Sequence, residues 1–226
     1  MIHILWPTLR VNVFMRIHKT WMERSSKKNI KTYVAVESQH DFDVLRQYSS
    51  EIEIKIANSP QIGVCYPSYI LSSDLKGDNN DIVILASDDF IPPEKWDEYL
   101  IEKLNNKSGI LMVRDGYQLP DSSNMLYPAI TIPIMTYDCL LKLNRNIYNP
   151  IYSHMFSDVE LYFNAKDLNL LIDNRLTDTT TFEHCHYAAG KRNADQNDVN
   201  YNKSWNKDSD TWNKRKNMPI EERLKV

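Results

Sequence analysis

The sequence predicts an α/β protein in which an open sheet is flanked by helices, and three observations carry this prediction. Strand-like and helix-like segments alternate through the first two-thirds of the 226 residues, as in βαβ units. The run DIVILA at residues 81–86 is apolar almost throughout, which is typical of a strand covered on both faces. A chain with 42% hydrophobic and 25% charged residues is globular rather than collagen-like, coiled-coil or disordered.

The first half of the chain is predicted to hold four strands and three helices. Apolar or alternating runs of β-forming residues place the strands at residues 2–6, 32–36, 52–57 and 81–86. Apolar side chains at helical spacing place the helices at residues 12–22, 41–48 and 66–75. Asn12 and Asp41 are expected to cap the first two of these helices.

The second half continues the alternation. A helix is expected after Pro92 and Pro93, with Trp96 on its apolar face, and a fifth strand is expected at residues 110–113. Turn-forming residues dominate the stretch 115–128. Beyond it, the pattern predicts strands at 129–135, 170–172 and 179–187 and helices at 137–143 and 158–167.

The expected organisation is one domain, residues 1–190, followed by a basic extension, residues 191–226. From Tyr187 onward 9 basic and 6 acidic residues give a net charge of +3, whereas 18 basic and 24 acidic residues precede it. Trp205 and Trp212 are seven residues apart and therefore share one face of a helix. That helix either packs against the domain or forms a mobile cover over a site.

Charge and cysteine content favour a cytoplasmic protein that has no overall basic field of the kind that attracts nucleic acid. The net charge is −3, from 27 basic and 30 acidic residues. Cys65, Cys139 and Cys185 cannot all pair and none forms a C-x-x-C motif, which is typical of a reducing compartment. The opening residues have no signal-peptide pattern, and no apolar run approaches the roughly 18 residues of a membrane span, so no transmembrane segment is expected.

The scarcity of glycine limits how a nucleotide could be bound. Only five glycines occur, and none of them forms a G-x-G-x-x-G motif or a Walker loop. If the chain binds a nucleotide, a device other than a glycine-rich phosphate cradle must hold the phosphates.

An acidic pair follows the buried strand at residues 81–86. Asp88 and Asp89 come directly after Ser87, where the carboxyl end of a strand borders the crevice of an open α/β sheet. Carboxylate oxygens are suitable ligands for Mg²⁺ or Mn²⁺, and such an ion can neutralise a diphosphate. The alternative is that one of the two carboxylates caps the helix that follows.

Two further segments carry candidate chemistry. In Phe182-Glu183-His184-Cys185-His186-Tyr187, the two imidazoles fall on one face of an extended strand and suit a metal or a phosphate. Asp158 lies at the start of a helix, in Ser157-Asp158-Val159-Glu160-Leu161. It is either a first-turn acid that complements the helix dipole or a general base that accepts a proton from an attacking hydroxyl.

Taken in order, these segments resemble the GT-A fold glycosyltransferases, specifically the family 2-like inverting group that uses nucleotide sugars. The similarity spans about residues 2–191. The matching features are a strand ending at Trp6-Pro7-Thr8, Glu37 after the second strand, Asn58 after the third, DIVILASDDF at the place of the D-x-D strand, SDVEL at the place of the E-D-x-x-L segment, and EHCHYAAGK as a late histidine strand. The resemblance implies a Rossmann-like open mixed sheet with a C-terminal helical extension.

The resemblance also implies roles for individual residues. Asp89 would ligate Mn²⁺ or Mg²⁺ with His184, and His186 competes for the same role, while Asp158 would be the catalytic base. The residues expected to bind the donor, a UDP-sugar, are Thr8, Arg10, Glu37, Asn58, Asp88 and Lys191. Ser87 and Ser157 depart from the family pattern, since an Asp and a Glu commonly stand at these places.

The implied reaction is a single displacement, in which a hexosyl group moves to a hydroxyl of the acceptor. The acceptor side is expected near Asp115, Tyr148 and Tyr152, where tyrosine rings could stack on a sugar or a base or could simply pack in the protein. The acceptor would be a glycan or modified DNA. The basic, Trp-bearing tail is the reason to include DNA, because ring stacking and attraction to phosphates commonly hold single strands.

Two other functions use the same residues. A metal-dependent phosphodiesterase or nuclease could be built from Asp88, Asp89, His184 and His186, although two metals would need more carboxylates. A non-catalytic module that binds sugars or nucleic acid is the other alternative. Nucleotide hydrolysis without an acceptor would favour the first, and no response to Mn²⁺ and nucleotide sugars would favour the second.

Overall fold

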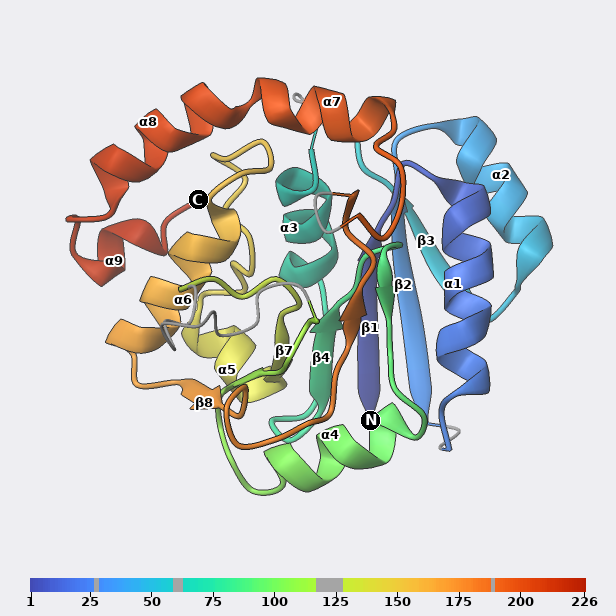
Figure 1. The fold of residues 1–226 in the computed structure, drawn as a ribbon, viewed down its shortest axis with the longest axis horizontal. Helices are drawn as coiled ribbons and strands as arrows, with labels where there is room; N and C mark the ends of the chain where they lie inside the picture. The colour runs from blue at the N-terminus through green and yellow to red at the C-terminus, as the bar shows by residue number, and fades with distance from the viewer. Residues whose placement is uncertain (27–28, 59–62, 117–127, 188–189) are drawn as a thin grey trace.

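The computed structural model describes residues 1–26, 29–58, 63–116, 128–187 and 190–226, and its centre is a seven-stranded mixed sheet (Figure 1). The order of the strands is β3-β2-β1-β4-β7-β6-β8. These strands are β1 (Ile2–Pro7), β2 (Ile30–Val36), β3 (Ile52–Ile56), β4 (Ile82–Leu85), β6 (Ile110–Met112), β7 (Ile134–Thr136) and β8 (Leu171–Asp173). A separate two-stranded sheet pairs β5 (Phe90–Ile91) with β9 (Glu183–His184).

Strand directions confirm the predicted mixed sheet. β1 runs parallel to both of its neighbours, so that Ile4 lies between Thr32 of β2 and Ile84 of β4. β7 is antiparallel to β4 and to β6. The carboxyl ends of β1 and β4 therefore lie at the same edge of the sheet, which is where the sequence predicts a binding crevice.

The helices that surround the sheet and form the extension have the following bounds. They are α1 (Val11–Glu23), α2 (Gln39–Tyr48), α3 (Cys65–Ser73), α4 (Trp96–Leu104), α5 (Tyr137–Lys142), α6 (Ser157–Asp167), α7 (Gln196–Lys203), α8 (Trp205–Arg215) and α9 (Ile220–Arg223). Among the described residues no helix combines the length and apolar character needed to cross a membrane.

The central strands are buried on both faces, because two hydrophobic clusters cover the sheet. In β1, Ile4 and Trp6 belong to the cluster that contains α1 and α4, whereas Leu5 between them belongs to the cluster that contains α3, α5 and α6. Alternate side chains of one strand point to opposite faces, so each face needs apolar residues. This double coverage explains why β4 is an unbroken apolar run and why β1 is apolar except for the buried His3.

Several predicted boundaries and caps are wrong. Ser38, not Asp41, caps α2, because its hydroxyl accepts the backbone N–H of Asp41 at 3.1 Å. Asn12 lies inside α1, whose N-cap position is Arg10. Residues 129–133 precede the short β7 as irregular chain, and β5 was not predicted, since a two-residue strand depends on a partner distant in the sequence. The N-cap of α4 is Lys95, so neither Asp88 nor Asp89 caps it.

The C-terminal extension packs along α6 (Figure 1). Trp205 and Trp212 contact Phe156 and Phe163, with ring centroids 4.9 and 5.4 Å apart. Both indoles therefore contact aromatic rings that precede residue 190 in the chain. Deeper in the same contact, the buried Glu160 carboxylate accepts two hydrogen bonds from Arg215, at 2.8 and 2.9 Å.

Replacing Arg215 with Met is expected to lower the free energy of unfolding by about 3–5 kcal/mol, because Glu160 would stay buried without its counter-charge. Urea denaturation followed by circular dichroism measures this change. Lys214→Met, at the exposed neighbouring position, serves as the control and should change stability by less than about 0.5 kcal/mol. A loss under about 1 kcal/mol for Arg215→Met would show that the pair does not anchor the extension.

Candidate active site

A cavity of about 600 Å³ opens at the edge of the sheet where β1 and β4 end. Its walls are residues 7–10 after β1, residues 87–90 after β4, and residues 154–159, where α6 begins. His184 lines it from β9 and His186 from the chain just beyond β9, and the extension contributes Arg192, Asp198 and Trp205. The fold thus brings together most of the segments that the sequence singles out.

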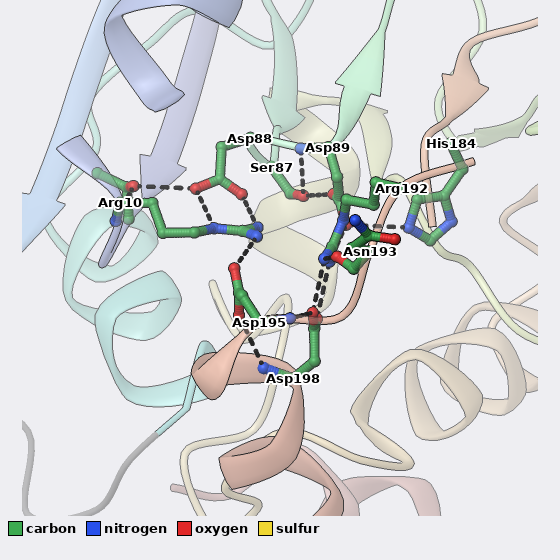
Figure 2. A network of polar contacts seen from close by, with 10 residues as sticks. Arg10, Ser87, Asp88, Asp89, His184, Arg192, Asn193, Asp195 and Asp198 are labelled. Carbon is green, nitrogen blue, oxygen red and sulfur yellow. Dashed lines mark hydrogen bonds and ion pairs between the residues drawn. The ribbon is translucent and has the colours of Figure 1, made fainter. Parts of the chain in front are cut away.

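Arg10 and Asp88 form a bidentate ion pair on one wall (Figure 2). The Nε atom of Arg10 donates to Asp88 at 3.0 Å, and a second guanidinium nitrogen bonds the other carboxylate oxygen. Thr8 donates to the same carboxylate at 3.3 Å. Burial by itself would lower the pKa of Arg10, but its hydrogen bonds to Asp88 raise that pKa, so the guanidinium remains charged.

Asp89 faces His184 across the cavity wall (Figure 2). The Oδ2 atom of Asp89 and the Nε2 atom of His184 are 3.4 Å apart, and Ser87 donates a hydrogen bond to Oδ1. Burial works to raise the pKa of Asp89, but the hydrogen bond and charge of His184 outweigh it and hold that pKa below its ordinary value. The imidazole of His184 is fixed by stacking on Phe90, with centroids 4.2 Å apart.

This pair has the chemistry and spacing of two ligands to one divalent cation. Ligands bound at right angles about 2.1 Å from an ion lie about 3 Å apart, close to the observed separation of Asp89 and His184. The ring of His186 is 4.9 Å from that of His184, so the two imidazoles are adjacent as predicted. No group of three His, Cys, Asp or Glu side chains in the described ranges is arranged to hold a metal. His186 is therefore adjacent to the Asp89–His184 pair but is not placed as a third ligand.

Asp158 occupies the first turn of α6 and lines the cavity. Its Oδ1 atom accepts the backbone N–H of Val159 at 2.9 Å, so the carboxylate does complement the helix terminus. Burial raises the pKa of Asp158 to about 6, although that hydrogen bond opposes the shift. A carboxylate with this pKa is ionised at neutral pH and still basic enough to accept a proton.

Arg192 and His154 also line the cavity, and neither is a residue that the sequence predicts for the site. Arg192 donates two hydrogen bonds to Asp198, at 2.6 and 2.7 Å, and lies 3.8 Å from Asp89 (Figure 2). Burial lowers the pKa of His154 to about 4, so its imidazole is neutral at physiological pH. Neither residue belongs to a sequence motif. The only signal near Arg192 is the adjacent Lys191, which the sequence predicts to bind the donor.

Three predicted donor-binding residues do not line the cavity. Glu37 is half-buried after β2, and its Oε1 atom has no hydrogen-bond partner among the described residues. Asn58 is exposed after β3. Lys191 contacts the carboxylate of Glu183 and the carbonyl oxygen of Gly116, each at 3.3 Å.

The three residues predicted for the acceptor side are all buried. Tyr148 lines the cavity, but its hydroxyl donates to the carbonyl of Ile130 at 3.0 Å. Tyr152 is completely buried and its hydroxyl donates to Glu160 at 2.7 Å. Asp115 is buried outside the cavity, and its carbonyl accepts the N–H of His184 at 2.8 Å. Most of the turn-rich stretch predicted at 115–128 lies outside the described residues.

Comparisons with known proteins identify the fold. No model of a protein family and no curated protein matches the sequence. S. aureus TarS in complex with UDP-GlcNAc superposes with a TM-score of 0.61 at 10% identity, over 80% of this chain and 57% of the TarS chain. The match therefore spans a little over half of that chain, which comprises TarS residues 1–349, and 36% of the longer TarS chain.

Two further structures align with a TM-score of 0.52 at 11% identity. A Drosophila β-1,4-galactosyltransferase 7 mutant, in complex with manganese, UDP-Gal and xylobiose, matches over 86% of this chain and 75% of its own. Glucosyl-3-phosphoglycerate synthase from Mycobacterium tuberculosis, in complex with Mn²⁺, UDP and phosphoglyceric acid, matches over 76% and 67%. The likeness in chain path, together with the mixed sheet and its edge cavity, shows that this chain has the GT-A glycosyltransferase fold.

Proposed function

We infer that this chain is a metal-dependent glycosyltransferase that moves a sugar from a UDP-sugar to an acceptor hydroxyl with inversion. One observation carries the inference: the Asp89–His184 pair and Asp158 line the same cavity, at the edge where β1 and β4 end. The similar structures were determined with UDP-GlcNAc, UDP-Gal or UDP, and two of them with manganese.

The charge of the cavity supports a requirement for a divalent cation. Four carboxylates line it among the described residues, from Asp88, Asp89, Asp158 and Asp198, against the two guanidinium groups of Arg10 and Arg192. Both guanidinium groups already bind carboxylates. A nucleotide diphosphate would therefore enter a negatively charged site, and a cation held by Asp89 and His184 would remove this repulsion.

The chain's own groups divide the remaining work. Asp158 accepts the proton of the acceptor hydroxyl while the oxygen of that hydroxyl bonds to the anomeric carbon. The bond from that carbon to the diphosphate breaks, and its electron pair leaves with the diphosphate. Asp89 and His184 would hold a divalent cation, which when bound would supply Lewis-acid stabilisation of the departing charge. Thr8 and Arg10 order the wall at the donor end by fixing Asp88.

A thermal-shift panel tests this function directly. The protein is heated with UDP-, GDP-, CMP- and dTDP-sugars, each with and without Mn²⁺, and nucleotide release is measured in parallel. Stabilisation that needs both Mn²⁺ and a UDP-sugar supports the inference. Equal stabilisation without metal would contradict the Asp89–His184 site, and no stabilisation by any donor would contradict the transferase function.

Asp158→Asn is expected to reduce sugar transfer by about 100-fold or more, because the amide cannot accept the proton. The Kd for the UDP-sugar with Mn²⁺, measured by calorimetry, should remain within about twofold of wild type. Asp210→Asn, an exposed acid on α8, is the control and should transfer sugar normally. Undiminished transfer by Asp158→Asn would exclude Asp158 as the base.

The pH dependence of transfer should report the ionisation of Asp158. Its raised pKa of about 6 means that the carboxylate is protonated below that pH and cannot act as a base. We expect kcat/KM for the acceptor to fall about tenfold per pH unit below pH 6 and to be level from pH 7 to 8. Rates that stay constant down to pH 4.5 would contradict this assignment.

Removing one ligand should uncouple metal from donor binding. Asp89→Asn and His184→Ala are each expected to abolish the Mn²⁺-dependent part of the thermal shift with UDP, because each removes one of two protein ligands. His40→Ala, exposed on α2, should retain the full shift. A Mn²⁺-dependent shift that survives in both variants would place the ion elsewhere.

A further inference from the structure

The half-exposed Trp205 forms part of the cavity wall although it belongs to the C-terminal extension. Its exposed fraction is 51%, whereas Trp6, Trp21 and Trp96 are completely buried. An indole left half in contact with water retains apolar surface that a ligand could cover. Trp212, one heptad later on the same helix, packs on Phe163 and does not line the cavity.

Phe156 extends this aromatic surface and adopts an unfavourable backbone conformation. Its φ angle of 65° lies in the left-handed region, which is unfavourable for a bulky side chain. Phe156 occupies the N-cap position of α6, but no side-chain hydrogen bond caps the helix there. This conformation places the phenyl ring in the cavity wall, 4.9 Å from the indole of Trp205.

The position of the two rings points to the acceptor end of the cavity. Phe156 is two residues from Asp158, so the aromatic surface borders the carboxylate that would receive the acceptor proton. The rings and Asp158 together offer an apolar surface beside a hydrogen-bond acceptor. A sugar ring matches this arrangement, because it has one face rich in C–H groups and a rim of hydroxyls.

Charge decides between a neutral sugar and a nucleic acid. The cavity has more carboxylates than guanidinium groups among its described lining residues, and each guanidinium is engaged by an aspartate. A polyphosphate chain would be repelled there, because single-strand binding sites combine stacking rings with a positively charged groove.

We propose that Trp205 and Phe156 form an acceptor subsite that stacks a neutral sugar ring beside Asp158, an inference that rests on the proposed transferase function. The extension thereby supplies part of the acceptor specificity. Trp205→Ala should raise the KM for the acceptor about tenfold, whereas acceptor-independent hydrolysis of the UDP-sugar should stay within about twofold of wild type.

The direct test measures binding without turnover. Acrylamide quenching of tryptophan fluorescence is recorded with UDP and Mn²⁺ present, while methyl β-glycosides of glucose, galactose, xylose and N-acetylglucosamine are titrated in turn. At least one glycoside should protect wild type from quenching. This protection should vanish in Trp205→Ala, and Trp212→Phe, the matched control on α8, should behave as wild type.

A second set of titrations uses the Trp205→Phe variant, and UDP-glucose or oligothymidylate in place of the glycosides. It distinguishes a failure of the sugar subsite from a failure of the transferase function. Trp205→Phe keeps an aromatic ring and should bind the protecting glycoside within about threefold of wild type. Protection by UDP-glucose alone, by oligothymidylate, or by none of the glycosides would overturn the subsite. Because UDP-sugar hydrolysis is measured independently, its persistence alongside such a result would leave the transferase function standing.

Discussion

One buried carboxylate, that of Asp208, holds the wall of the cavity from which Asp158 projects. It is completely buried on α8 and accepts the consecutive backbone N–H groups of Ser153, His154 and Met155 at 2.9–3.0 Å. These donors belong to irregular chain before α6, where no strand or helix would pair them. A buried carboxylate is tolerated only with such partners, so the extension and this segment stabilise each other.

The polar network of the site also connects the sheet edge to the C-terminal extension. Arg10 bridges Asp88, at the end of β4, to Asp195 in the extension, and Arg192 links Asp198 to the neighbourhood of Asp89 (Figure 2). Each guanidinium thus joins the sheet edge to the chain beyond residue 190. The extension contributes to the charge balance of the cavity as well as to its wall.

Prediction from the sequence succeeded where the signal is local. Strands β1 and β4 follow from short apolar runs, and the two-residue spacing of His184 and His186 predicts their adjacency, although β9 ends at His184. It failed where a residue's role depends on distant partners. Nothing local distinguishes Tyr152, bonded to a buried glutamate, from a tyrosine that faces a ligand, and the contacts of Arg192 span elements far apart in the chain.

Trp205 and Trp212 show how one sequence pattern leads to two different roles. Their spacing of seven residues equals that of Phe156 and Phe163, so the ring contacts recur at the same interval along α8 and α6. Phe163 lies inside α6, and its partner Trp212 is therefore part of a helix–helix contact. Phe156 precedes the first residue of α6, so its partner Trp205 lies at the N-terminal end of that helix. Trp205 and Asp158 line the cavity there. Helix packing alone thus places an aromatic ring from the extension at the candidate catalytic carboxylate.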